Sequence, residues 1–270
     1  MSLATHPGAT LPRRPRAWAV PAATWAGIIA LTVVSCIPAW GGVGVDLEAI
    51  AKNWHNGASR LAKMFQPDWS ILPRTWTPLA ETLAMAVLAA AISALICIPV
   101  MLWAARSTNP HAPARIAVRS VLNVMRSIPD LVYATILVAM IGVGALPGII
   151  TLVLFDVGIV VKLVSEAIDS ADDSYMEAGR AAGGTQAQIN QVTALPQTWP
   201  AFISQVIYSL ELNVRISAVL GLVGAGGIGL LIEEVRGFYR YDALAAIICE
   251  LLVVIILLEI ISVQLRKRLR

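Results

Sequence analysis

Seven ionisable side chains stand within strongly apolar stretches of this sequence: Asp156, Lys162, Glu166, Glu211, Arg215, Glu250 and Glu259. A charged group at the centre of a membrane costs about 2.5–3.5 kcal/mol on insertion scales, so such residues mark an ion pair or a functional contact. Lys162 and Glu166 are four residues apart, which places them on one face of a helix, and we interpret them as a structural pair.

Arg215 is the member of this group best suited to contact an oxyanion. Its guanidinium offers forked N–H donors that match phosphate or phosphonate oxygens, and Asn213 and Ser217 stand on either side. Glu211 precedes it by four residues, so an ion pair on one helical face is the competing interpretation. The sequence therefore makes Asn213, Arg215 and Ser217 the candidate substrate path.

A polar loop, residues 172–196, carries a second set of local signals. Ser174 with Glu177, and Thr185 with Gln188, each have the spacing of a helix capping box. In a capping box, the first side chain accepts a hydrogen bond from the backbone N–H three residues on, and the second side chain accepts one from the backbone N–H of the first residue. The loop is therefore predicted to contain two short helices.

Glycine and proline give the expected ends of these two helices. Gly183 and Gly184 end the first helix, because glycine tolerates the left-handed backbone of a helix C-terminus. Pro196 is expected to end the second. Both helices have apolar faces that need a partner; their residues are Met176, Ala178, Ala181, Ile189 and Val192.

The composition is that of a membrane protein. Of the 270 residues, 57% are hydrophobic and 14% are charged, whereas soluble domains have about 45–50% apolar and about 25% charged residues. The excess apolar surface therefore faces lipid, and the length allows about six spans of ~20 apolar residues. The net charge is only +3, without a basic stripe, so nothing points to nucleic-acid binding.

Six apolar runs give the expected spans: 17–40, 78–104, 120–143, 147–168, 197–232 and 241–264. The fifth is interrupted by polar residues and glycines, so we expect a span that is broken near its middle or followed by a partly unwound segment. The first run is long for a cleavable signal peptide, the alternative interpretation, and we interpret it as a retained span.

The remaining segments complete the expected domain organisation. Residues 1–16 form a tail, and residues 41–75 form an extracytoplasmic loop. Within that loop, apolar residues recur at helical spacing over 46–65, which predicts an amphipathic helix at the membrane surface or packed on the spans. The core of the protein, 76–265, is followed by a basic tail, 266–270. If both ends of the chain are placed in the cytoplasm, the inner segments carry more Lys and Arg residues than the outer ones. We therefore expect both termini to be cytoplasmic.

Several chemistries have little support in the sequence. Cys36, Cys97 and Cys249 fit no metal-binding spacing and are expected to be free thiols. The histidines lie in tails or loops, so an intramembrane enzyme lacks its catalytic cluster; they are His6, His55 and His111. The pattern G-x-G-x-x-G at 224–229 has no preceding strand, which argues against a dinucleotide site. No phosphate-binding G-x-x-x-x-G-K-[ST] loop occurs, so ATP must be bound by another polypeptide.

The 172–196 loop resembles the "EAA" loop of ABC importer permeases, and five residues match at the family spacing: Glu177, Ala178, Gly183, Leu195 and Pro196. Gly179 and Thr193 depart from the family pattern. Arg126-Ser127-Ile128-Pro129-Asp130 is similar to the R-x-x-P-E/D signature of binding-protein-dependent permeases. The segment 211–229 is similar to phosphonate-uptake permeases. Together these resemblances cover roughly 75–265.

The resemblance implies an all-α polytopic fold, an ABC importer permease with cytoplasmic coupling helices. It implies a homodimer, two ATPase subunits that bind ATP and Mg and dock on the matching loop residues, an extracytoplasmic binding protein, and no cofactor, metal or catalytic residue in this chain. Phosphonate, phosphate or a related phosphorus oxyanion is the implied substrate. The glycines of the similar segment would form a gate or pack helices: Gly221, Gly224, Gly226, Gly227 and Gly229.

Two alternatives to this function remain at the sequence level. The same class of permease could carry an amino acid or a sulfonate, because the binding protein selects the substrate. An ion-coupled secondary transporter would need inverted repeats, and we find no convincing internal repeat in the sequence.

Overall fold

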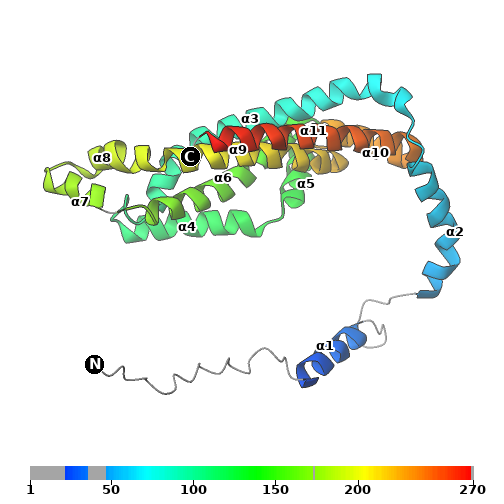
Figure 1. Ribbon diagram of the computed structural model, residues 1–270, viewed down its shortest axis with the longest axis horizontal. Helices are drawn as coiled ribbons and strands as arrows, with labels where there is room; N and C mark the ends of the chain where they lie inside the picture. The colour runs from blue at the N-terminus through cyan, green and yellow to red at the C-terminus, as the bar shows by residue number, and fades with distance from the viewer. Residues whose placement is uncertain (1–21, 36–46, 173, 269–270) are drawn as a thin grey trace, which may run out of the picture. The chain divides into compact units, whose positions relative to one another are not determined.

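The computed structural model describes residues 22–35, 47–172 and 174–268. The chain divides into two compact units, residues 1–59 and 60–270, each of which we describe by itself. Throughout the described residues, the chain consists of helices and turns (Figure 1). The predicted tail, 1–16, and Cys36 lie outside the described residues.

The first unit contains α1, Ala22–Ser35, and most of α2, Leu47–Met64. The 14 residues of α1 are apolar and lie inside the predicted span 17–40, whose other residues are not described. The predicted amphipathic helix at 46–65 coincides with α2, where the large side chains of Trp54 and Leu61 are exposed. Its place at the membrane surface stays a prediction.

Four helices of the second unit are long and apolar enough to cross a membrane: α3, Leu72–Ala104; α6, Ala145–Asp169; α9, Leu195–Leu220; and α11, Tyr241–Lys267. In Figure 1 they run side by side, and α3, α6 and α9 contact one another along their lengths. These helices confirm four of the six predicted spans.

The predicted span 120–143 is instead a bent pair of helices. The first, α4, is Ala112–Ser127, and the second, α5, is Asp130–Ile141, at 85° to it. The pair can count as a fifth crossing, with a bend that the sequence analysis did not predict. The bend has a local cause, because a residue before proline avoids the helical conformation. Ile128 precedes Pro129 and is extended, with φ −90° and ψ 125°.

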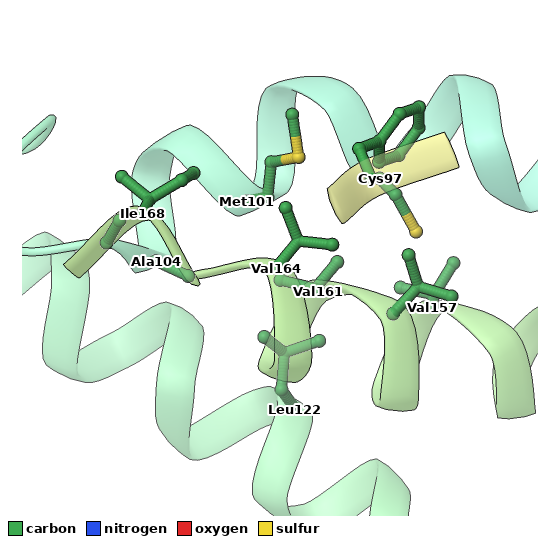
Figure 2. Packing of buried hydrophobic residues seen from close by; sticks show 11 residues of the cluster. Cys97, Met101, Ala104, Leu122, Val157, Val161, Val164 and Ile168 are labelled. Carbon is green, nitrogen blue, oxygen red and sulfur yellow. The ribbon is translucent and has the colours of Figure 1, made fainter. Parts of the chain in front are cut away.

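The core between α3, α4, α6 and α9 is built from small and branched side chains. Figure 2 shows its packing: Cys97 and Met101 of α3 lie over Val161 and Val164 of α6, and Leu122 of α4 closes the far side. Such close packing stabilises helix association in lipid, where water supplies no hydrophobic driving force between helices. Cys97 is a buried free thiol and Cys249 an exposed one, as expected for these two.

The helix α9 is continuous through its polar residues, so the expected break near the middle of the fifth span is absent from the described helix. The other expectation is confirmed, because α9 is followed by a 3-10 turn and an irregular glycine segment. This segment leads into α10, Ile228–Gly237. An ion pair joins α10 to the start of α3, with Arg74 2.7 Å from Glu234.

Candidate functional site

The 172–196 loop forms a compact two-helix unit at one end of the long helices (Figure 1). Its helices are α7, Ser174–Ala181, and α8, Gln186–Ile189, which confirms the predicted pair. The capping box of α8 is present: the backbone N–H of Thr185 donates to Gln188 Oε1 at 2.9 Å, and Thr185 Oγ1 accepts from the Gln188 backbone.

The start of α7 differs from the prediction. Ser174 is already the first helical residue, so it does not cap the helix in a box with Glu177. Its backbone N–H instead donates to Asp172 Oδ1 at 3.0 Å. The hydrogen bonds from the backbone and side chain of Ser174 hold the pKa of the Asp172 carboxyl below its usual range. An ionised Asp172 is also favourable beside a helix N-terminus.

The helix α7 ends where the two glycines predict. Gly183 has a φ of +79°, in the left-handed region. Its N–H donates to the carbonyl of Arg180 at 3.0 Å, and that of Gly184 donates to the carbonyl of Gly179 at 3.1 Å. These bonds satisfy carbonyl groups at the helix end and turn the chain toward α8.

Pro196 does not end the second helix, contrary to the expectation. It lies in the first turn of α9, and a π-helical stretch, Asn190–Ala194, joins α8 to α9. Proline lacks an N–H and its ring clashes with the carbonyl four residues earlier in a regular helix. The wider π turn relieves this conflict. The loop therefore continues into α9 without a non-helical break.

The apolar faces of the loop are partly satisfied within it. Met176 of α7 and Ile189 of α8 are buried against each other and Ala194. Ala178, Ala181 and Val192 of the same predicted faces remain exposed, Val192 at 73%. An exposed apolar surface on a preformed two-helix unit is what a docking partner would cover.

The structure separates the five predicted coupling residues into two groups. Glu177, Ala178, Gly183 and Pro196 are exposed. Leu195 is half-buried and packs against the core shown in Figure 2. Leu195 therefore joins the loop to the bundle, while the other four lie where a partner could touch them.

Polar residues that the sequence did not single out attach the loop to the bundle. Asn190 Nδ2 donates to the carbonyl of Thr108 at 2.9 Å, and Gln186 Nε2 donates to Asn190 Oδ1 at 2.8 Å. Nearby, Arg119 pairs with Asp169 at 2.7 Å. The i, i+4 spacing of Gln186 and Asn190 was the only available signal, since their backbone partner is about 80 residues away in sequence.

A network of ion pairs surrounds Arg215. Its guanidinium is 2.6 Å from Glu211 and 3.7 Å from Glu259, and Arg266 lies 3.4 Å from the other oxygen of Glu211. The side chain of Arg215 is 42% exposed, whereas that of Glu211 is 6% exposed. The i, i+4 pair that competed with a substrate role is thus present, and Arg215 still faces open space. Lys162 and Glu166 also form their predicted pair.

The three residues of the predicted substrate path do not converge. Asn213 and Ser217 are fully buried on α9, and Ser217 Oγ donates to the carbonyl of Val214. Arg215 lies on the more exposed face of the same helix. Asn213 therefore belongs to a buried polar cluster, and Arg215 alone of the three has a partly exposed side chain.

The glycine segment after α9 is closely packed. A side chain at Gly221 would lie 2.4 Å from the Cα of Gly229, so the two backbones touch where the chain folds back. Gly227 has a φ of +69°, and the next N–H, of Ile228, donates to Thr82 Oγ1 of α3 at 2.8 Å. Helix packing, one of the two predicted roles, describes this geometry. A gating role stays a prediction.

Comparisons with known proteins agree with this architecture. The family described as "Binding-protein-dependent transport system inner membrane component" matches residues 98–270. The phosphite transport system permease protein PtxC of Stutzerimonas stutzeri is 40% identical over 211 residues, which are 78% of this chain and 76% of PtxC. The phosphate-import permease protein PhnE of Mycolicibacterium smegmatis is 33% identical over 78% of this chain, which spans 40% of that relative.

A solved structure shows the same fold. A chain of the MetNI methionine ABC transporter, in an inward-facing conformation, superposes with a TM-score of 0.67 at 23% identity. The match covers 74% of this chain and 98% of the solved one. The all-helical importer fold expected from the sequence is thereby confirmed.

Proposed function

The chain belongs to the family of inner membrane components of binding-protein-dependent transport systems, and we propose that it is the permease subunit of an ATP-driven importer of a phosphorus oxyanion. The observation that carries the substrate class is the 40% identity with a phosphite permease over most of both chains. Phosphite, phosphate and phosphonate share a tetrahedral phosphorus with charged oxygens, so one path can pass all three.

The exposed surface of α7 and α8 is the proposed docking site for a separate ATPase subunit. Glu177, Ala178 and Gly183 lie on it, beside the exposed side chain of Val192. Two ATPases, each binding ATP and Mg, would dock on a homodimer of this chain, and an extracytoplasmic binding protein would deliver the substrate. The end of α11 at Lys267 lies toward the same end of the bundle as this loop, which supports a cytoplasmic C-terminus (Figure 1). The N-terminus is proposed to be cytoplasmic as well.

The connections of the loop support a mechanism of alternating access. Movement of the docked ATPases would move α7 and α8, and the π-helical stretch Asn190–Ala194 continues directly into α9. The bond from Asn190 to Thr108 gives a second path, to the connection between α3 and α4. The substrate shifts this equilibrium only through different affinities for the two states.

Arg215 is the proposed transient contact for the anion. Its pairing with Glu211 and Glu259 occupies part of the guanidinium, and its exposure leaves the remaining N–H donors accessible. A partly neutralised cation suits a conduit, because tight binding would slow release. Arg also offers two parallel donors to a phosphorus oxyanion.

The test is uptake into membrane vesicles that contain the assembled transporter and its binding protein. Labelled phosphite, phosphate, methylphosphonate and methionine are supplied in separate experiments. In each, ATP is present either on the side of the membrane that carries the ATPase or only on the opposite side. We expect ATP-dependent uptake of at least one phosphorus oxyanion and none of methionine. Uptake of methionine alone would overturn the substrate class, and uptake driven by an ion gradient without ATP would overturn the transporter class.

A further inference from the structure

Asp156 lies at the centre of a buried polar cluster that joins three of the long helices. It belongs to α6 and is fully buried. Its Oδ2 accepts a hydrogen bond from Ser93 Oγ of α3 at 3.1 Å and another from Asn213 Nδ2 of α9 at 2.8 Å. Ser93 and Asn213 are themselves 1% and 0% exposed.

Two oxygen atoms of this cluster have no hydrogen-bond donor. They are Asp156 Oδ1 and Asn213 Oδ1, one on each of the two groups that already share a hydrogen bond. A buried acceptor without a donor costs about 1–3 kcal/mol, and more when the group is charged. The cluster therefore lacks hydrogen-bond donors, not acceptors.

Positive charge that could balance an ionised Asp156 is absent from the ion pairs found among the described residues. On α9, Arg215 pairs with Glu211 and Glu259, away from the cluster. Lys162 of α6 pairs with Glu166. On α4, Arg126 packs its aliphatic chain beside Gly158, without an ion pair to Asp156. On α3, the buried thiol of Cys97 lies one turn beyond Ser93 and supplies no positive charge.

A single proton would give both unpaired oxygens a hydrogen-bond partner. If Asp156 is a carboxylic acid, its Oδ1–H can donate to Asn213 Oδ1 while Asn213 Nδ2 donates to Asp156 Oδ2, which makes a cyclic pair of two parallel hydrogen bonds. Both unpaired oxygens then have partners. A neutral pair also avoids the cost of a carboxylate in a medium of low dielectric constant. Two free oxygens are too few for Mg²⁺ or Ca²⁺, which take six or more ligands.

We propose that Asp156 binds a proton at neutral pH and, as a carboxylic acid, forms a cyclic hydrogen-bonded pair with the Asn213 amide that joins α6 to α9. Ser93 extends the pair to α3. The cluster is thus a proton-binding site and a neutral polar link between three spans, independent of which solute the protein carries.

Infrared spectroscopy of the purified, assembled transporter tests the protonation directly. The carbonyl stretch of a protonated carboxyl is separate from the carboxylate bands and shifts in D2O. We expect such a band at neutral pH in the wild type, shifted when aspartate carrying ¹³C in the side-chain carboxyl is incorporated. Asp156 is the buried aspartate among the described residues, and loss of the band in Asp156→Asn would assign the band to it. Absence of the band in the wild type would overturn the proposal, whatever the variants do.

Substitutions provide the second measurement. Asp156→Asn keeps the shape and can form an amide–amide pair with Asn213, so we expect its thermal stability and uptake to match the wild type and the infrared band to be lost. Asp156→Leu removes the pair and leaves the Asn213 amide with only its longer, 3.5 Å bond to the carbonyl of Ala86, so we expect a lower melting temperature. A melting temperature that rises with sodium in the wild type, and not in Asp156→Asn, would show a bound cation and would overturn the protonated pair.

Discussion

The side-chain amide of Asn190 donates a 2.9 Å hydrogen bond to the backbone carbonyl of Thr108, which attaches the two-helix loop to the connection between α3 and α4. Thr108 is itself fixed, because its Oγ1 donates to the carbonyl of Leu102 at 2.6 Å. Besides its chain connections to α6 and α9, the loop is therefore attached by this bond to the connection between α3 and α4. A displacement of α7 and α8 would therefore be transmitted to α9 and to the connection between α3 and α4.

Asn190→Ala is expected to weaken the coupling between ATP hydrolysis and transport. The change removes the bond to Thr108, and the bond from Gln186 also loses its acceptor. A net hydrogen bond contributes about 0.5–1.5 kcal/mol, so insertion and assembly should persist. The measurement is the amount of substrate taken up per ATP hydrolysed, and it should fall. The exposed neighbour provides the control, since Gln191→Ala should leave the ratio unchanged. An unchanged ratio in Asn190→Ala would show that this bond transmits nothing.

Gly183→Leu is expected to uncouple transport while membrane insertion stays normal. The φ of +79° at this position costs a residue with a side chain about 1–2 kcal/mol, and the added side chain would stand on the proposed docking surface. Gly183→Asn separates the two effects, because asparagine tolerates the left-handed region better. We expect loss of the ATPase from purified Gly183→Leu complexes and partial retention with Gly183→Asn. Full transport and a complete complex with Gly183→Leu would exclude docking here.

The local structure of the loop could be predicted because its signals act over a few residues. Thr185 with Gln188 and the glycine at 183 determine a cap and a turn by themselves. The role of Pro196 could not be predicted in the same way. A proline in a helix is unfavourable in isolation, and only the wider π-helical turn before it makes the continuous helix possible. No residue pattern in the sequence predicts such a turn.

Contacts between distant residues were also beyond prediction. Asn213 appeared to belong with Arg215 because the two are neighbours in sequence. The structure instead pairs Asn213 with Asp156, 57 residues away. A helix turns by about 100° per residue, so a shift of two positions moves a side chain to another face. Which face is buried depends on the neighbouring helices, and these cannot be assigned from one sequence.

Gly221→Ala is expected to destabilise the protein strongly. Its Cβ would lie 2.4 Å from the Cα of Gly229, and backbone atoms cannot move aside as a flexible side chain would. Gly237→Ala is the matched control, because a Cβ there meets nothing within 4 Å and alanine favours a helix by about 1 kcal/mol over glycine. The melting temperature of the purified complex should fall in the first variant and stay equal or rise in the second. Equal melting temperatures would show that the Gly221–Gly229 contact is not required.

The last prediction is that Arg215 contacts the substrate anion and does more than balance Glu211. The two interpretations differ in the double variant Glu211→Gln/Arg215→Gln. If Arg215 only neutralises Glu211, removal of both charges should be tolerated, because replacing a buried pair together is often nearly neutral. If Arg215 guides the anion, the double variant should assemble and hydrolyse ATP, yet take up a labelled phosphorus oxyanion poorly.

Glu211→Gln alone is the matched control for this experiment. It removes the acid that is 2.6 Å from Arg215 and leaves the guanidinium with Glu259 at 3.7 Å. Arg266 also loses its carboxylate partner in both variants, so any effect of that loss is shared. We expect the single variant to retain uptake and Arg215→Lys to be intermediate, because lysine keeps the charge and loses the forked donors. With matched protein levels, normal uptake by the double variant would leave Arg215 a structural residue, since the anion would then cross without its guanidinium.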